Sequence, residues 1–297
     1  MIEGVPRCRG RAPLSRSSSR ADVRARGEGE ARVALLEARG VRKAYGHVQV
    51  LHGVDFEAEA GQVTALIGDN GAGKSTLVKI LSGALAPDAG ELRLRERPVR
   101  LTSPEHARSL GVETVYQDLA LAPELGPAEN VFAGRELLRP GLLGRLGVLD
   151  KKTMRARAQE AFTSMGTDVK DLDAAVAALS GGQRQSVAIC RAVMWAKDLV
   201  FLDEPTAALG VRQTGKVLEL VRRVADSGVG VVLISHNMTE VLEVADSVQV
   251  LRLGRRVASL PARGTTVADL VGAMTGALDT PVTDARADER ADGAGAR

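Results

Sequence analysis

The stretch Gly68-Asp69-Asn70-Gly71-Ala72-Gly73-Lys74-Ser75 decides the fold class of this chain. It matches the pattern G-x-x-x-x-G-K-[ST], in which backbone N–H groups turn inward around phosphate oxygens. A short apolar run at residues 62–67, typical of a buried strand, precedes it. A helix is expected to begin at Lys74, and the positive potential of its N-terminus favours a bound phosphate. The stretch therefore predicts a strand, a phosphate-binding loop and a helix in that order.

Within this phosphate-binding loop, two side chains have distinct chemical tasks. Lys74 can reach the β- and γ-phosphates of a nucleotide, and the hydroxyl of Ser75 can bind Mg²⁺. The candidate nucleotide contacts are Gly68, Asp69, Asn70, Gly71, Ala72, Gly73, Lys74, Ser75 and Thr76. The loop alone leaves the reaction open, because kinases, GTPases and helicases share it.

A pair of carboxylates narrows the reaction. Four apolar residues at 199–202 end in Asp203 and Glu204, which places both acids at the carboxyl edge of a buried strand. Ligands of open α/β sheets bind at that edge. Asp203 would orient Mg²⁺ through water, and Glu204 would polarise the water that attacks the γ-phosphate. The pair therefore predicts nucleotide hydrolysis.

Strand and helix patterns alternate along the chain and predict an α/β fold with a mainly parallel sheet. Strand pairs are expected at 35–56 and at 91–101, the second interrupted by Arg97-Pro98, and a hairpin at 248–259 around Gly254. Residues 119–178 have helical patterns only, most clearly at 150–165. The remaining expected elements are a helix after residue 182, a strand at 199–202, a helix at 211–227 and a strand at 230–234.

Composition restricts the class of partner. The sequence pI is about 9.0, but residues 1–33 hold eight Arg against four acidic residues, so the rest of the chain sums to about −1. This places the basic character in a tail, and nucleic acid is not expected as a partner. Residues 1–33 and 279–297 are expected to be disordered, the first as an Arg/Ser-rich extension. No apolar run approaches the roughly 18–20 residues that cross a bilayer.

A third motif connects the chain with a family. Leu179-Ser180-Gly181-Gly182-Gln183 resembles the signature of ATP-binding cassette (ABC) ATPases. The resemblance covers most of the chain and implies one ABC domain over residues 34–278. It also implies a P-loop NTPase (RecA-like) core, an antiparallel β subdomain and an inserted α-helical subdomain at about 119–185.

The resemblance also implies roles for single residues. Gln117 is similar to the glutamine that contacts Mg²⁺ and reports nucleotide state to membrane subunits, and His236 to the histidine that contacts the γ-phosphate. Tyr45 resembles the aromatic residue that stacks on adenine. The catalytic set is then Glu204, His236 and Gln117, and the Mg²⁺ set is Ser75, Gln117 and Asp203. The signature residues Ser180, Gly181, Gly182 and Gln183 would complete an ATP site in a second copy.

Several segments, among them residues 111–121 and 129–136, resemble the single-cassette ATP-binding subunits of bacterial ribose-, xylose- and fructose-type importers. This implies ATP hydrolysis coupled to import of a small solute, in that branch of the family a monosaccharide, through separate transmembrane permease subunits. The helical insert would dock those subunits, an extracytoplasmic solute-binding protein would deliver the solute, and two copies would form an ATP-dependent homodimer. The chain would then lie at the cytoplasmic face of the membrane. The solute itself is not readable from the sequence.

One position departs from the family pattern. The family usually reads Ser-Ala-Leu-Asp after the Glu-Pro-Thr that begins at Glu204, whereas this chain ends the run in Leu209-Gly210. In the family the Asp helps the two nucleotide sites communicate. Nucleotide binding and Mg²⁺ positioning should survive its loss, and the property that this position affects is the degree of coupling between the two nucleotide sites. Alternative functions are a soluble ABC ATPase acting on DNA or the ribosome, a regulatory cassette without turnover, and an exporter subunit.

Overall fold

In the computed structural model, the described residues are 34–167, 169, 171–207 and 209–277. The contacts divide the chain into the units Met1–Arg32 and Val33–Arg297, and all described residues belong to the second unit. The disorder expected for residues 1–33 and 279–297 concerns segments outside the described residues.

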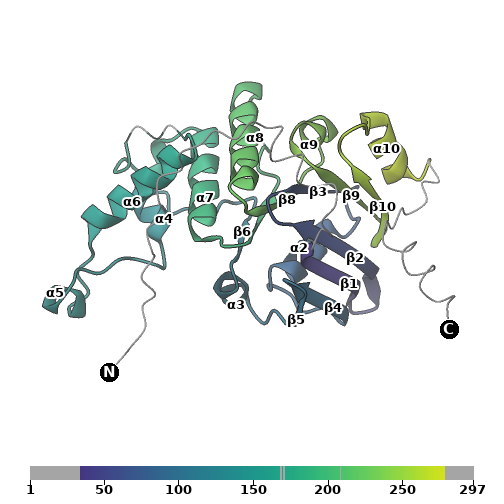
Figure 1. Cartoon of the computed structure of the whole chain (residues 1–297), viewed down its shortest axis with the longest axis horizontal. Helices are drawn as coiled ribbons and strands as arrows, with labels where there is room; N and C mark the ends of the chain where they lie inside the picture. The colour runs from purple at the N-terminus through teal and green to yellow at the C-terminus, as the bar shows by residue number, and fades with distance from the viewer. Residues whose placement is uncertain (1–33, 168, 170, 208, 278–297) are drawn as a thin grey trace, which may run out of the picture. The chain divides into compact units, whose positions relative to one another are not determined.

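An antiparallel sheet of four strands, in the order β2-β1-β4-β5, forms one subdomain (Figure 1). Its strands are β1 (Ala34–Tyr45), β2 (Val48–Glu59), β4 (Ala89–Leu94) and β5 (Arg97–Val99). The strand pair expected at 35–56 is confirmed, and so is the pair at 91–101, but its interruption was placed wrongly. The turn lies at Arg95-Glu96, whose φ angles are 51° and 62°. Positive φ at both central residues is typical of a two-residue type I′ hairpin, and Pro98 is tolerated in the edge strand β5.

A second sheet of six strands, in the order β10-β9-β3-β8-β7-β6, forms the core expected from the phosphate-binding loop. Neighbours from β6 to β9 are parallel, and β10 pairs antiparallel with β9. Its strands are β3 (Val63–Ile67), β6 (Val112–Val115), β7 (Leu199–Asp203), β8 (Gly230–Ile234), β9 (Ser247–Arg252) and β10 (Arg255–Pro261). Every residue of β3 and β8 is buried, as is typical of parallel strands covered on both faces.

Helices pack against this sheet, and their buried apolar side chains belong to three hydrophobic clusters. The helix α2 (Lys74–Leu81) packs between the two sheets. The helices α7 (Gly181–Trp195) and α8 (Val211–Asp226) cover one face of the parallel sheet. The helices α9 (Met238–Val244) and α10 (Val267–Thr275) pack on β3, β9 and β10. The expected helices at 74–83, after 182 and at 211–227 are thereby confirmed, and α3 (Pro104–Ser109) is a short helix that the sequence did not predict.

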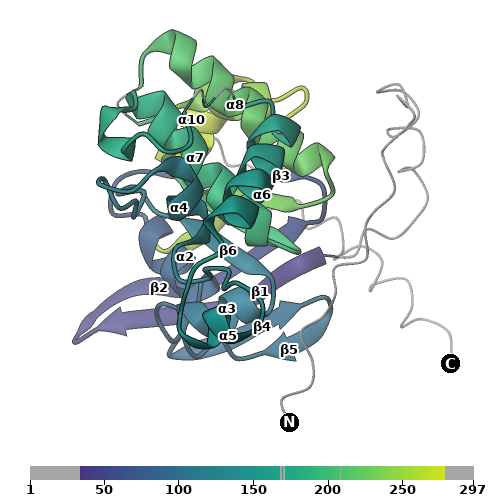
Figure 2. The same cartoon turned by 90° about the vertical axis from the view of Figure 1, so that its left-hand side faces the viewer.

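The helical insert extends from the core sheet beyond β6. It contains α4 (Pro127–Phe132), α5 (Leu142–Arg145), α6 (Lys151–Ser164) and the 3-10 turn η1 (Val176–Ala178). Figure 2 shows α4, α6 and α7 as neighbours, and Phe132 and Phe162 from the first two lie in one hydrophobic cluster with Val187 of α7. The mixed α/β class with an antiparallel β subdomain and an α-helical insert is confirmed.

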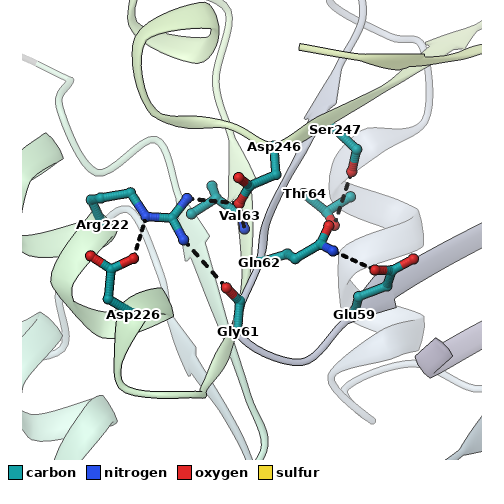
Figure 3. Close-up of polar contacts among 9 residues, drawn as sticks. All are labelled: Glu59, Gly61, Gln62, Val63, Thr64, Arg222, Asp226, Asp246 and Ser247. Carbon is teal, nitrogen blue, oxygen red and sulfur yellow. Dashed lines mark hydrogen bonds and ion pairs between the residues drawn. The ribbon is translucent and has the colours of Figure 1, made fainter. Parts of the chain in front are cut away.

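An ion-pair network fixes α8 to the amino-terminal edge of the core sheet (Figure 3). Arg222 contacts Asp246 at 2.7 Å and Asp226 at 3.0 Å, and donates to the carbonyl oxygen of Gly61 at 3.3 Å. Asp246 also accepts from the backbone N–H of Val63, the first residue of β3, at 2.9 Å. These polar contacts occupy the edge opposite to the phosphate-binding loop and leave the carboxyl edge free for a ligand. Among the described residues, no helix has the length and apolar character to cross a bilayer.

Candidate functional site

The phosphate-binding loop follows β3 and leads into α2, as the sequence predicts. Three of its glycines have positive φ: 155° at Gly68, 82° at Gly71 and 101° at Gly73, the residue that caps α2. A Cβ atom on Gly68 would lie 2.1 Å from the carbonyl oxygen of Leu251, so only glycine fits there. The glycines therefore permit both the backbone conformation of the loop and its close approach to β9.

Lys74 is buried inside this loop, with 9% of its surface exposed. Its Nζ donates to the carbonyl oxygens of Gly68 at 2.6 Å and Asp69 at 3.0 Å. Burial lowers the pKa of the ammonium, and the carboxylates of Glu204, Asp69 and Asp203 partly oppose this effect. A buried ammonium within a glycine loop at a helix N-terminus is a donor set that fits the phosphates of a nucleotide.

The turn between β9 and β10 supports the loop from one side, a role that the sequence did not reveal. The backbone N–H of Gly254 donates to the carbonyl oxygen of Ala72 at 3.0 Å, and its own carbonyl accepts from the N–H of His52 at 2.8 Å. A Cβ atom on Gly254 would lie 2.1 Å from the carbonyl oxygen of Val50. The signal in the sequence was a hairpin glycine, which indicates a turn but not what the turn contacts.

Asp203 and Glu204 lie at the carboxyl end of β7, where the sequence places them. Asp203 is half-buried, and burial together with the neighbouring Glu204 raises its pKa, while Lys74 and Lys79 lower it less. Glu204 has a φ of 51°, a left-handed conformation that is uncommon for a residue with a side chain. Its backbone N–H donates to the carbonyl oxygen of Ile234, the end of β8, at 2.9 Å. The strand-to-loop junction therefore fixes the direction of Glu204 through backbone contacts.

His236 lies against Glu204, because β8 is the neighbour of β7. The Nδ1 atom of His236 lies 2.6 Å from Oε2 of Glu204; 70% of the His side chain is exposed and 19% of the Glu side chain. The following residue, Asn237, accepts from the N–H groups of Thr239 and Glu240 and so caps α9. A helix thus begins directly after His236. The sequence predicted both residues, and the structure brings them together.

Gln117 and Tyr45 are less closely connected with the other candidates. Gln117 is exposed in a turn after β6, which the hydrogen bond from the N–H of Leu119 to the carbonyl oxygen of Tyr116 closes at 2.9 Å. Tyr45 is the last residue of β1 and is 49% exposed. In the described part of the chain, no hydrogen bond joins either side chain to the phosphate-binding loop.

The signature residues 179–183 form the N-terminus of α7. The Ser180 hydroxyl accepts from the N–H of Gln183 at 3.3 Å, and the Gln183 side chain accepts from the N–H of Ser180 at 3.0 Å. This reciprocal capping box stabilises the start of the helix. A Cβ atom on Gly182 would lie 3.0 Å from Cβ of Gln213 on α8, so this glycine allows the two helices to approach closely.

A pocket of about 560 Å³ opens beside the signature, between α7 and α8. Ser180 and Gln183 line it together with the basic side chains of Arg212 and Lys216. No hydrogen bond of the described residues joins the signature to the phosphate-binding loop. The buried lysine loop and the capped N-terminus of α7 are therefore two distinct groups of candidate ligand contacts in the described part of the chain.

Comparison with known proteins agrees with this arrangement. The family model described as ABC transporter matches residues 51–207. The fructose import ATP-binding protein FrcA of Rhizobium meliloti is 47% identical over 249 residues, which cover 83% of this chain and 96% of that protein. The xylose/arabinose import ATP-binding protein XylG of Sulfolobus acidocaldarius is 44% identical over 241 residues, which cover 81% and 94%.

Solved structures share the fold. A dimeric ATP-binding cassette in a post-hydrolysis state, bound to ADP and Pi, superposes with a TM-score of 0.64 at 23% identity, covering 77% of this chain and 100% of that chain. The chain belongs to the ABC transporter family. Within that family it is similar to the ATP-binding subunits of importers, and it has the fold of an ATP-binding cassette.

Proposed function

We propose that this chain hydrolyses ATP to drive import of a monosaccharide through separate membrane subunits. The names of the fructose and xylose/arabinose import proteins support the sugar and the direction of transport. The observation that carries the proposal is the contact of 2.6 Å between His236 and Glu204 at the carboxyl end of β7, on the edge of the sheet that also holds Lys74. Which monosaccharide is imported depends on the other subunits.

In the proposed mechanism, Lys74 and the N–H groups of the phosphate-binding loop hold the β- and γ-phosphates of ATP. Ser75, Asp203 and Gln117 would hold Mg²⁺. The bound ion would neutralise part of the negative charge of the phosphates. The carboxylate of Glu204 accepts a hydrogen bond from the attacking water and so orients it. The ring of His236, held against Glu204, would contact the γ-phosphate. Tyr45 would stack on the adenine.

The second ATP-binding surface requires a second copy of the chain. We infer that the capped N-terminus of α7, with Ser180, Gly181, Gly182 and Gln183, faces the γ-phosphate held by the partner's phosphate-binding loop. The helix N-terminus would lower the cost of that negative charge. The dimeric cassette among the solved structures supports a dimer of this kind. ATP then joins the two copies, and hydrolysis separates them.

The proposed partners follow from the importer function. Transmembrane permease subunits would contact the helical insert, and an extracytoplasmic binding protein would deliver the solute. The chain would lie peripherally at the cytoplasmic face of the membrane. The alternative is a regulatory cassette without turnover: Gly210 leaves it open, the intact Lys74 and Glu204 argue against it, and turnover distinguishes the two.

The experiment compares Mg²⁺-dependent ATP hydrolysis and size-exclusion chromatography in ATP for the original chain and Glu204→Gln. Loss of the general base should reduce turnover by about 10²-fold or more while ATP binding persists. The variant should then elute as an ATP-dependent dimer. The control is Glu160→Gln, an exposed acid on α6, which should change neither quantity. Equal turnover in the original chain and Glu204→Gln would reject the proposed role, and absent turnover even with the permease would favour the regulatory alternative.

A further inference from the structure

An arginine on the signature helix contacts the turn that contains Gln117. Arg191 donates from Nη1 to the carbonyl oxygen of Ala120 at 2.6 Å and from Nη2 to that of Leu119 at 2.8 Å. The partners are 71 and 72 residues apart in sequence. One planar guanidinium therefore binds two consecutive backbone carbonyls, a geometry for which the fixed fork of arginine is suited.

The turn adopts a backbone conformation that needs such support. Leu119 and Ala120 have φ angles of 59° and 46°, in the left-handed region that residues with a side chain rarely adopt. The hydrogen bond from the N–H of Leu119 to the carbonyl oxygen of Tyr116 makes Gln117 the second residue of a four-residue turn. Arg191 therefore binds the carbonyl oxygens of the residues that set the position of Gln117.

Helix α7 also contacts α4 and, through Arg135, strand β6. Trp195, one helical turn after Arg191, donates from Nε1 to the carbonyl oxygen of Val131 on α4 at 3.0 Å. Arg135 lies 4.9 Å over the Trp195 ring and contacts Glu113 of β6 at 2.7 Å. Because Gln117 lies directly after β6, α7 is connected both to the strand that precedes the turn and to the turn itself.

The positive charge of Arg191 strengthens its two hydrogen bonds to the carbonyl oxygens of the turn. Burial lowers its pKa, and the acids Glu113 and Asp118 oppose that effect, while Arg108 adds to it. An arginine stays protonated in proteins, so its two bonds to carbonyl oxygens are charge-assisted.

We infer that Arg191 is a positioning residue that makes the Gln117 turn and the signature helix move as one body. Ser180 and Arg191 are eleven residues apart on α7, a span of roughly 16 Å along a helix axis. A displacement of the signature end by the partner's ATP would therefore reach Gln117 through Arg191. The inference rests on the role proposed above for Gln117 and adds the element that connects this residue with the other copy.

A double-mutant cycle tests the inference on the full chain. The variants are Arg191→Met, Gln117→Ala and the double variant, assayed for kcat, KM for ATP and the Mg²⁺ concentration that gives half the maximal rate. Each single change should reduce kcat by about tenfold and raise that Mg²⁺ concentration. If Arg191 acts through Gln117, the double variant should equal Gln117→Ala. Arg191→Lys, which keeps the charge but not the fork, should recover part of the rate.

The control is Arg157→Met, an exposed arginine on α6, which should leave all three constants unchanged. Multiplicative losses in the double variant would overturn the inference, because Arg191 would then act independently of Gln117.

Amide hydrogen exchange separates this inference from the role of Gln117. Peptides covering residues 116–122 should exchange faster in Arg191→Met than in the original chain, while peptides of α10 stay unchanged. If Gln117→Ala has no effect on hydrolysis, the proposed role of Gln117 fails, but the exchange result still decides whether Arg191 holds the turn. Unchanged exchange at 116–122 in both Arg191→Met and Arg191→Lys would reject the inference.

Discussion

The imidazole Nδ1 of His236 lies 2.6 Å from Oε2 of Glu204, and the two residues follow the carboxyl ends of the neighbouring parallel strands β8 and β7. Glu204 is mostly covered, whereas His236 is 70% exposed. This contact holds an exposed ring with one edge on the carboxylate, which leaves the other ring nitrogen directed away from Glu204. We expect this second nitrogen to be the one that meets the γ-phosphate.

Replacement of His236 by alanine should lower kcat by about 10²-fold and leave the affinity for ATP nearly unchanged. The reason is that the ring is proposed to act on the reacting phosphate and on Glu204, not on the base or ribose. Steady-state kinetics and ATP binding by calorimetry measure the two quantities. His106→Ala removes a histidine of α3 outside the proposed site and serves as the control. A large rise in KM with an unchanged kcat would contradict the assignment.

Replacement of Asp203 by asparagine should raise the melting temperature of the nucleotide-free chain at neutral pH while it reduces Mg²⁺-dependent turnover. Burial raises the pKa of Asp203 above its ordinary value of 3.8. At pH values between 3.8 and the raised pKa, the folded chain holds a proton on Asp203 that the unfolded chain has lost. The free energy of unfolding therefore falls as the pH rises through this range. Above this range the destabilisation is complete, and asparagine removes it.

Melting curves at several pH values check this prediction. The difference between Asp203→Asn and the original chain should grow as the pH rises from 4 and then level off. A lower melting temperature for the variant at neutral pH would show that the carboxylate stabilises the fold instead.

Replacement of Gly254 by alanine should weaken ATP binding and lower the free energy of unfolding by roughly 2–4 kcal/mol. The new Cβ would lie 2.1 Å from the carbonyl oxygen of Val50, and the turn that supports the phosphate-binding loop would shift. Gly264→Ala is a matched control, because Gly264 has a φ of 88° but, apart from its chain neighbours, no described atom lies within 4 Å of its Cβ position. It should cost only about 1–2 kcal/mol of backbone strain. Equal effects of both changes on ATP binding would contradict the support that we assign to Gly254.

Replacement of Gly210 by aspartate should stabilise the chain by a few tenths of a kcal/mol, because Gly210 is the N-cap of α8 and makes no side-chain cap. Apart from its chain neighbours, no atom of the described residues lies within 4 Å of its Cβ position, so a Cβ atom fits without a clash. Since this change restores the acid that the family usually has there, we also expect a higher Hill coefficient for ATP hydrolysis. Denaturant unfolding and the ATP dependence of the rate measure the two effects, and an unchanged Hill coefficient would separate Gly210 from coupling.

The sequence predicted those parts of the molecule that depend on local pattern. The phosphate-binding loop, the acids after β7 and the helix at the signature lie where their motifs place them, since each motif includes the backbone geometry that it needs. Strand β6 was not predicted, because its central residues Glu113 and Thr114 are polar. The contacts of Arg191 and Gly254 were not predictable, because each joins segments that are remote in sequence and share no pattern. The roles of Tyr45 and Gln117 stay predictions.

The capping box at Ser180 determines the direction in which this serine can bind a ligand. Its oxygen accepts the N–H of Gln183 at 3.3 Å, which leaves the hydroxyl hydrogen and one lone pair for a ligand. The hydroxyl hydrogen can be donated to a phosphate oxygen. The capping contact therefore lets Ser180 hold the start of its own helix and bind an anion at the same time.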